Sequence, residues 1–184
     1  KPTYVIYGAT DAKSIKNYAA RIKRKRHNIV VLGRLSKDND LPIVLKALGK
    51  IKSKFPRVPI TFVGDGEFRS QAAKLGKVTG FHLHTIQYAS KASLVVASSY
   101  LSILDALAVG RPVIAVYSNS LKHDYLSGSP MARYITIVST PEELARAIGD
   151  HFKHRPRTVS GSQWATRQTW GKIAKKYQQL WTKN

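Results

Sequence analysis

The sequence predicts an α/β domain in which a mostly parallel β-sheet is flanked by helices. Short apolar runs alternate along the chain with segments whose apolar residues recur at helical spacing. The runs are rich in Val, Ile and Leu without a polar residue at every second position, which is typical of strands buried on both faces. The length of 184 residues suits one domain with a sizeable core, so we expect residues 1–184 to form a single domain.

In the first half of the chain we expect strands at residues 4–7, 29–32 and 60–63. A basic amphipathic helix is predicted over residues 11–26. Asp40 is predicted to cap a second helix, which carries Leu41 to Ile51 on one apolar face. A third helix is expected over residues 68–75, where Gly76 ends it.

In the second half we expect strands at residues 81–86, 94–97, 112–116 and 135–138, and a helix at 100–109. Thr140-Pro141-Glu142-Glu143 has the form of a capping box that opens a further helix. One long helix is predicted from about residue 162 to residue 181, after a linker at 154–157.

The chain is strongly basic. Lys and Arg number 31 against ten Asp and Glu, which gives a net charge of +21. The cations gather in residues 13–26 and after Asp150, beyond which the sequence has no acidic residue. Such a field favours anionic partners, namely phosphorylated substrates, anionic lipid head groups or nucleic acid, although a solvated basic surface would have the same composition.

Cysteine is absent, which excludes disulfides, thiolate metal sites and cysteine nucleophiles. No apolar run approaches the roughly 20 residues that cross a bilayer. We therefore expect a cytoplasmic protein that lies at the membrane periphery.

Four strand-to-helix corners are candidate ligand sites, because in parallel sheets the ligand lies at the carboxyl ends of the strands, next to helix N-termini. These corners are residues 33–40, 64–67, 97–102 and 117–121.

The first corner carries Gly33, Arg34 and Lys37. The glycine lets the backbone approach a ligand, and the two cations could clamp a diphosphate or be ordinary surface charges. The second corner carries Gly64, Asp65 and Gly66. Its glycines indicate that a ligand or a neighbouring loop passes close by, and Asp65 is expected to cap the following helix.

The third corner is the most informative. Ser98, Ser99 and Ser102 stand at the start of a helix, where hydroxyls and free N–H groups make a phosphate seat. Asp105 lies among apolar residues of the same helix and requires a partner if it is buried. Two partners compete: the hydroxyls of a sugar, or a cation such as Arg111.

Three segments together resemble a known family. Gly-Arg-Leu at 33–35, Val-Gly-Asp-Gly at 63–66 and Leu-Asp-Ala-Leu-Ala-Val-Gly-Arg-Pro-Val-Ile-Ala at 104–115 resemble the C-terminal half of GT-B glycosyltransferases, of the retaining group 1, family 4 type. The resemblance implies a Rossmann-like domain that holds a nucleotide-sugar donor. It also implies an interdomain segment at residues 1–28 and a C-terminal helix at 158–184.

Carried over by position, the resemblance implies that Arg34 contacts the donor diphosphate. It implies that Gly64 and Gly66 line the nucleotide side of the cleft. Asp105 stands where the family has a glutamate that binds the donor ribose, so a nucleotide-diphosphate sugar is the expected substrate.

The chain departs from the family at two positions. Asn39 stands where the family has a lysine, and Ala97 stands where it has the first of two glutamates. The shortened, serine-rich corner is more similar to that of inverting GT-B enzymes that act on lipid-linked acceptors. The resemblance therefore leaves the stereochemical outcome open.

The resemblance places the acceptor site in an N-terminal domain that this sequence lacks, and implies no tightly bound cofactor. His82 and His84, expected on one strand face, and His123 are candidate polar site residues, but no metal site is expected. A non-catalytic GT-B-like subunit and a basic nucleic-acid-binding module are the alternative functions. The second alternative lacks a recognisable nucleic-acid motif.

Overall fold

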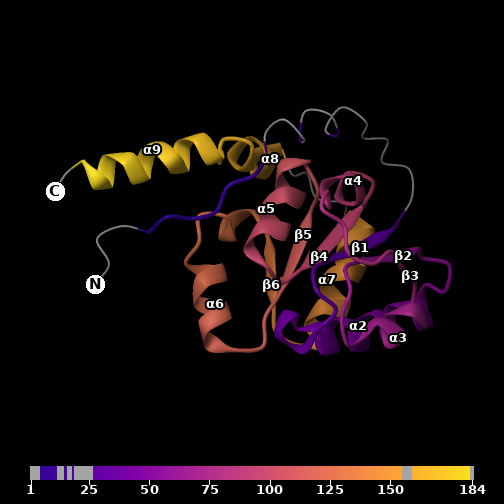
Figure 1. Cartoon of the computed structure of the whole chain (residues 1–184). Helices are drawn as coiled ribbons and strands as arrows, with labels where there is room; N and C mark the ends of the chain where they lie inside the picture. The colour runs from indigo at the N-terminus through magenta and orange to yellow at the C-terminus, as the bar shows by residue number, and fades with distance from the viewer. Residues whose placement is uncertain (1–4, 12–14, 16–17, 19–26, 155–158, 183–184) are drawn as a thin grey trace.

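The structure is a computed structural model that describes residues 5–11, 15, 18, 27–154 and 159–182. Its centre is a six-stranded parallel sheet with the strand order β3-β2-β1-β4-β5-β6 (Figure 1). The strands are β1 Ile29–Leu32, β2 Ile60–Val63, β3 Lys77–Val78, β4 Leu94–Ala97, β5 Val113–Val116 and β6 Thr136–Val138. This is the strand order of a doubly wound Rossmann-like domain, so the predicted fold class is confirmed.

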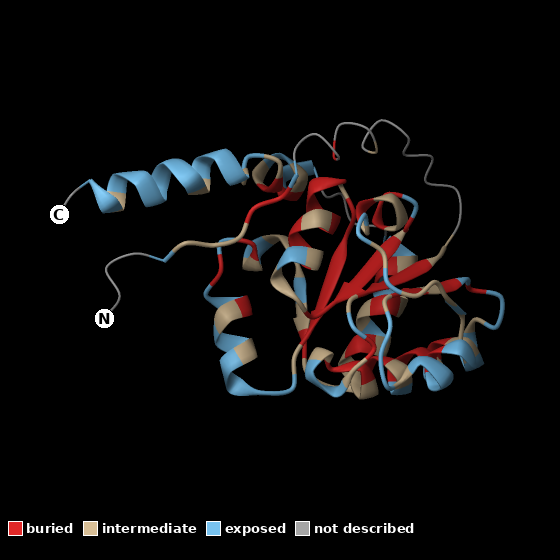
Figure 2. Ribbon diagram, viewed as in Figure 1, coloured by how far each residue is buried: buried red, intermediate tan, exposed pale blue. Residues whose placement is uncertain are grey.

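The four inner strands, β1, β2, β4 and β5, are largely buried on both faces, and successive residues along each of them point to opposite faces (Figure 2). Ile29 and Val31 of β1 join one apolar cluster with helices α2 (Leu41–Lys54) and α7 (Pro141–His154). Val30 and Leu32 join the opposite cluster, with α5 (Tyr100–Ala108) and residues of α4 (Ile86–Ala89). Continuous Val, Ile and Leu runs therefore fit a three-layer sandwich of helix, sheet and helix.

The remaining helical elements complete the domain around this sheet. They are η1 Lys37–Asn39, α3 Arg69–Ala73, α6 Ser120–Ser127, η2 Ala132–Tyr134, α8 Val159–Ala165 and α9 Trp170–Trp181. Helix α9 extends away from the body of the domain (Figure 1), and no residue of it is buried. No helix among the described residues is long and apolar enough to span a bilayer.

The predicted capping box is confirmed. The Thr140 hydroxyl accepts a hydrogen bond from the Glu143 amide at 3.1 Å, and the Glu143 carboxylate accepts from the amides of Ser139 and Thr140. These hydrogen bonds, led by those from Ser139, lower the pKa of the Glu143 carboxyl. Pro141 takes the first helical position, as expected of a residue without an amide proton.

The strand predicted at residues 81–86 is wrong. The chain pairs with β2 earlier, through Lys77–Val78, and Gly80 then turns it at φ 81°. The Phe81 and Leu83 side chains are exposed, and α4 begins at Ile86. The alternation of apolar and histidine residues resembles a strand, but in this loop the apolar side chains face solvent. His82 and His84 therefore do not share a strand face.

The single helix predicted at 162–181 is also wrong, because the chain forms α8 and α9 with a break between them. In the break, the Thr10 amide donates to the Gln168 carbonyl at 2.9 Å, and Thr169 is extended. The helix stops because an N-terminal segment takes part of its backbone hydrogen bonding.

The N-terminal predictions are tested only in part. Residues 5–9 are not a strand, and only Thr10 forms an isolated bridge, with Thr169. Tyr4, most of the helix expected over 11–26 and residues 155–157 of the linker lie outside the described residues.

Candidate functional site at the carboxyl edge of the sheet

Four corner loops follow β1, β2, β4 and β5 where these parallel strands end. They are residues 33–40, 64–67, 97–102 and 117–121, and we refer to them together as the carboxyl edge. Since β1 is hydrogen-bonded to both β2 and β4, the first three corners are neighbours in space. The topology thus brings the sequence-predicted corners together.

Glycines allow the first two corners to interlock. Gly64 has φ 154°, and a Cβ atom there would lie 1.9 Å from the Gly33 carbonyl oxygen. At Gly66, a Cβ would lie 2.5 Å from the Leu35 carbonyl oxygen. The close approach of the first corner therefore accounts for the absence of a side chain at Gly64 and Gly66.

Arg34 and Lys37 are both exposed on the first corner. The Arg34 guanidinium pairs with Asp38, while the Lys37 amide donates to the Glu67 carboxylate at 2.9 Å. The Ser36 hydroxyl donates to Asp38, and this contact, together with the positive charge of Arg34, lowers the pKa of the Asp38 carboxyl. Asp65 does not cap α3; it pairs with Arg69 at 2.5 Å, and the N-cap position is Phe68.

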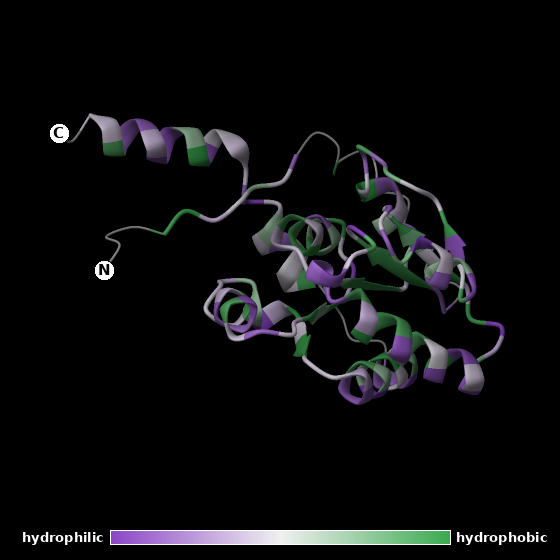
Figure 3. Cartoon of the chain, turned by 60° about the horizontal axis from the view of Figure 1, so that its bottom comes forward, coloured by the Kyte–Doolittle hydropathy of each residue, from purple (hydrophilic) through white to green (hydrophobic). Residues whose placement is uncertain are grey.

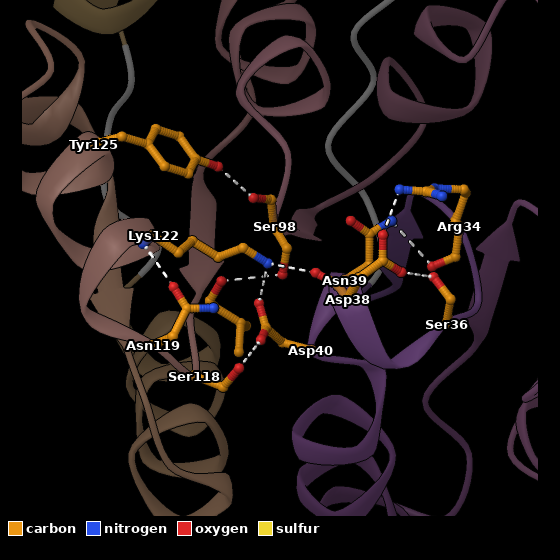
Figure 4. Close-up of polar contacts among 11 residues, drawn as sticks. Arg34, Ser36, Asp38, Asn39, Asp40, Ser98, Ser118, Asn119, Lys122 and Tyr125 are labelled. Atoms are coloured by element: carbon orange, nitrogen blue, oxygen red, sulfur yellow. Dashed lines mark hydrogen bonds and ion pairs between the residues drawn. The ribbon is translucent and has the colours of Figure 1, made fainter.

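Asp40 does not cap α2 through its side chain, contrary to the sequence prediction. It adopts a left-handed conformation (φ 58°), and its carboxylate is directed away from the helix, toward the corner after β5. There the Ser118 hydroxyl donates to one oxygen, and the Lys122 ammonium lies 2.6 Å from the other (Figure 4). A buried ion pair thus joins the first corner to the fourth.

The third corner, residues 97–102, which we call the serine corner, presents backbone amides to a ligand more than serine hydroxyls. The Ser98 side chain is buried and donates to the Val116 carbonyl at 3.0 Å, so its hydroxyl is not presented at the edge. The Ser99 hydroxyl donates to that of Ser102 at 2.8 Å. Ser99 is the N-cap of α5 without a side-chain capping bond, so the first amides of α5 remain for a ligand or for water.

Asp105 lies in the second turn of α5, where its neighbours are buried apolar residues. Its carboxylate accepts a hydrogen bond from the Thr10 hydroxyl at 2.7 Å. Burial raises the pKa of the Asp105 carboxyl, and the Thr10 hydrogen bond offsets part of this effect. The Arg111 guanidinium donates instead to the Ser90 carbonyl, and the salt bridges of the described residues do not include one between Arg111 and Asp105.

A cavity of about 190 Å³ opens beside the Asp105 carboxylate. Its wall includes Thr10, His84, Thr85, Leu101, Asp105 and Trp170. It therefore combines an aromatic ring, an imidazole and a carboxylate, which suits a polar ring compound with hydroxyl groups.

A larger cavity, of about 790 Å³, lies among His27, Phe55, Val58, Pro59 and Phe152. These residues precede β1 and β2 or belong to the end of α7, so the cavity is at the amino edge of the sheet. Because ligands of doubly wound sheets bind at the carboxyl edge, we assign the site to the smaller cavity and the adjoining corners.

The three candidate histidines are separate. His82 lies 2.9 Å from the Tyr88 hydroxyl, His84 lines the Asp105 cavity, and the His123 ring is tilted against Tyr117 at 4.9 Å. Within the described ranges there is no group of three His, Asp or Glu side chains that could hold a metal ion.

Sequence reasoning missed Thr10, Trp170 and Lys122. The first two come from the ends of the chain, and no spacing pattern relates them to Asp105. A signal existed for Lys122, because Asn119 follows a strand and caps α6 by accepting from the Lys122 amide at 2.8 Å. A capped helix start indicates which side chains lie near the corner.

Comparison with solved structures finds the same fold. The Anabaena protein HepE in complex with UDP matches with a TM-score of 0.76 and 17% identity, over 98% of this chain and 57% of that one. The pneumococcal O-GlcNAc transferase GtfA, in complex with UDP and GlcNAc, matches with a TM-score of 0.65 and 15% identity, over 95% and 37%. WaaG, a glycosyltransferase involved in lipopolysaccharide biosynthesis, matches with a TM-score of 0.62 and 17% identity, over 88% and 50%.

The chain therefore spans between about a third and three fifths of the length of these neighbours. No curated protein sequence matches it significantly. The family model described as "Glycosyl transferases group 1" matches residues 26–154, which are most of the chain and include all four corners. The fold, the corners and this match together confirm the resemblance, and the chain belongs to the group 1 glycosyltransferase family.

Proposed function

We propose that this chain binds the nucleotide-diphosphate sugar from which a glycosyltransferase transfers its sugar. The observation that carries the proposal is Asp105, a carboxylate on a mostly apolar helix. It lines a cavity together with an aromatic ring and an imidazole. Ribose hydroxyls would donate hydrogen bonds to this carboxylate and offset the free-energy cost of its burial. Two of the solved neighbours, HepE and GtfA, are complexes with UDP, which makes UDP the first nucleotide to test.

The diphosphate would extend from this cavity toward the serine corner and the first corner. The amides of α5 after Ser99, together with Arg34 and Lys37, would face the charge that builds up on the diphosphate as the bond to the sugar breaks. Arg34 would leave Asp38 and bind the phosphate. This exchange costs little free energy, because the ion pair between Arg34 and Asp38 is exposed to solvent. Gly33, Gly64 and Gly66 would keep the loop backbone close to the ligand on the nucleotide side.

Calorimetric titration of UDP, GDP and their sugars into the 184-residue chain tests the proposal. We expect one nucleotide to bind, and its uridine or guanosine nucleoside to compete for the same cavity. Failure of all four compounds to bind would contradict donor binding and would favour a non-catalytic subunit that retains the fold.

We further propose that the acceptor binds to a part of the protein beyond these residues. Helix α9 supports this, because it lies apart from the rest of the domain (Figure 3). Ile173, Tyr177 and Trp181 recur on one side of it at helical spacing, and the described part of the chain leaves this side largely uncovered. A second domain that packs against this face of α9 would cover it.

An anionic membrane surface is a second proposed partner. Lys172, Lys175 and Lys176 lie on the face of α9 opposite its aromatic residues, and they are exposed. Each cation near an anionic surface contributes up to about 1 kcal/mol. Nucleic acid is the less favoured polyanion, since the aromatic residues of α9 do not lie among its lysines as a base-stacking surface requires.

A further inference from the structure

We infer that Lys122 is a phosphate-binding cation of the carboxyl edge, held in place by Asp40 until an anion enters. The inference rests on the proposed donor-binding function, because it assigns one more residue to the diphosphate. Apart from the Asn119 cap at the start of α6, the sequence does not single out Lys122, and the inference rests on the geometry of its contacts.

The position of Lys122 is fixed from several sides. Its ammonium donates to the Asp40 carboxylate at 2.6 Å and to the Asp38 carbonyl at 2.7 Å (Figure 4). The helix that carries it is tied to the serine corner, because the Tyr125 hydroxyl donates to the Ser98 carbonyl at 2.6 Å. The ammonium therefore contacts the corner after β1, while the helix that carries it contacts the corner after β4.

Burial of the ion pair between Asp40 and Lys122 costs free energy, which suggests a role other than stability. The Asp40 side chain is 1% exposed and that of Lys122 is 13% exposed. Removing two charges from water offsets much of their mutual attraction, so a buried ion pair is weak evidence for stability. Asp40 also holds a left-handed conformation that non-glycine residues rarely adopt, and such strain is often found at functional sites.

The ammonium also has unused capacity. A lysine ammonium has three N–H donors, and the described residues supply acceptors for two of them. A phosphate oxygen at the edge would take the third donor. The phosphate and the Asp40 carboxylate would then both be attracted to the same ammonium.

Arg34 differs from Lys122 in this respect. The Arg34 side chain is 73% exposed and can follow a ligand only by losing its freedom of movement. Lys122 is already ordered, so it would bind an anion with a smaller loss of side-chain entropy. Lys122 is therefore the better fixed of the two cations.

Inorganic pyrophosphate is the probe, because it occupies a diphosphate seat whatever nucleoside the protein prefers. We expect Lys122→Met to lower pyrophosphate affinity roughly tenfold or more, the usual effect of losing a hydrogen bond to a charged group. Lys122→Arg should retain most of the affinity. The control is Lys50→Met, which removes another ion-paired lysine, one that pairs with Glu142 across α2 and α7.

Asp40→Asn separates a binding role from a structural one. If Lys122 binds phosphate, removal of the competing carboxylate charge leaves pyrophosphate affinity unchanged or higher. If the pair only fastens two corners together, Asp40→Asn and Lys122→Met should lower the affinity alike. Equal losses in these two variants, or in Lys50→Met, would overturn the inference.

A measurement on the unmodified chain covers the case in which a variant does not fold. With ¹⁵N-labelled lysine, the ζ-nitrogen resonance of Lys122, assigned through Lys122→Arg, should shift as pyrophosphate is added. A wild-type chain that binds UDP while this resonance stays in place would contradict the role of Lys122 and leave donor binding intact. A chain that binds neither UDP nor pyrophosphate would contradict both proposals.

Discussion

Asp105 is the residue on which the donor-site assignment depends. Asp105→Asn keeps the shape and retains an oxygen for the Thr10 hydroxyl, but removes the charge that strengthens hydrogen bonds from ribose. We expect nucleotide affinity to fall by roughly 1.5–3 kcal/mol. Thermal stability without ligand should stay the same or rise, since burial already disfavours the charged form.

Calorimetric titration and thermal melts of the two proteins check this prediction. Unchanged affinity together with a large fall in melting temperature would show that Asp105 is a structural residue. Thr10→Val is the matched control. It leaves the carboxylate in place without its donor, and should destabilise the apo protein by about 1–3 kcal/mol.

The pH dependence of stability also follows from Asp105. Its pKa in the folded chain is raised above the ordinary value of 3.8. A raised acid pKa means that the folded chain retains the proton longer, so the contribution to stability is full below pH 3.8 and is lost as pH rises through the folded pKa. Denaturation as a function of pH should show this loss in wild type and not in Asp105→Asn; identical profiles would contradict it.

Glycine substitutions test how the first two corners pack. Gly64→Ala should destabilise the fold by at least about 2 kcal/mol, because its Cβ would overlap the Gly33 carbonyl and its φ is unfavourable for alanine. Gly49→Ala is the matched control within α2, where a Cβ meets no atom within 4 Å. It should stabilise the protein by about 0.5–1 kcal/mol. Urea denaturation of both variants measures the two shifts, and shifts of the same sign would contradict the loop contact.

Periodicity predicts the elements that bury one clear face. Strands β1, β2, β4 and β5 and helix α5 lie where their apolar runs place them. Periodicity fails at residues 81–86, where apolar side chains serve an exposed loop, and at Thr166–Thr169, where Thr10 interrupts the helix. At the helix break, a contact between distant segments outweighs local preference, and one sequence does not reveal such contacts. At residues 81–86, an alternating pattern that is typical of a half-buried strand belongs to an exposed loop.

The candidate site shows the same division. Gly33, Arg34 and Ser99 could be placed at strand ends from the sequence, because the corners follow directly from the strand predictions, and Asp105 could be placed on the helix after the third corner. The ion pair between Asp40 and Lys122 could not, since 82 positions separate the two residues. A capping role for Asp40 is a reasonable local interpretation, and tertiary pairing replaces it.

The whole molecule carries a net charge of +21, which should direct it to anionic membranes. We expect the chain to float with liposomes that contain anionic lipid, and binding to fall as salt is added, because salt screens surface charge. Replacing Lys172, Lys175 and Lys176 with glutamine should weaken binding at low salt. Equal binding to neutral liposomes would contradict the electrostatic account.

The 184-residue chain alone should not transfer sugar to an acceptor. It spans 57% or less of the neighbours described above, and the acceptor site is proposed to lie elsewhere. The measurement is transfer of labelled sugar from a nucleotide sugar to candidate acceptors. UDP binding serves as the control that the chain is folded. Measurable transfer would show that a donor domain of this size is sufficient.

The outermost strands of the sheet are also its shortest. β3 has two residues and β6 has three, and Lys77 and Thr136 on them are exposed. Long, flat outer strands are templates on which sheets of separate molecules join and aggregate, and these two expose too little unpaired backbone to serve as such templates. The strong positive charge keeps molecules apart as well. Aggregation in concentrated solution should therefore begin at exposed apolar side chains and not at the sheet edges, and it should decrease when the aromatic face of α9 is made polar.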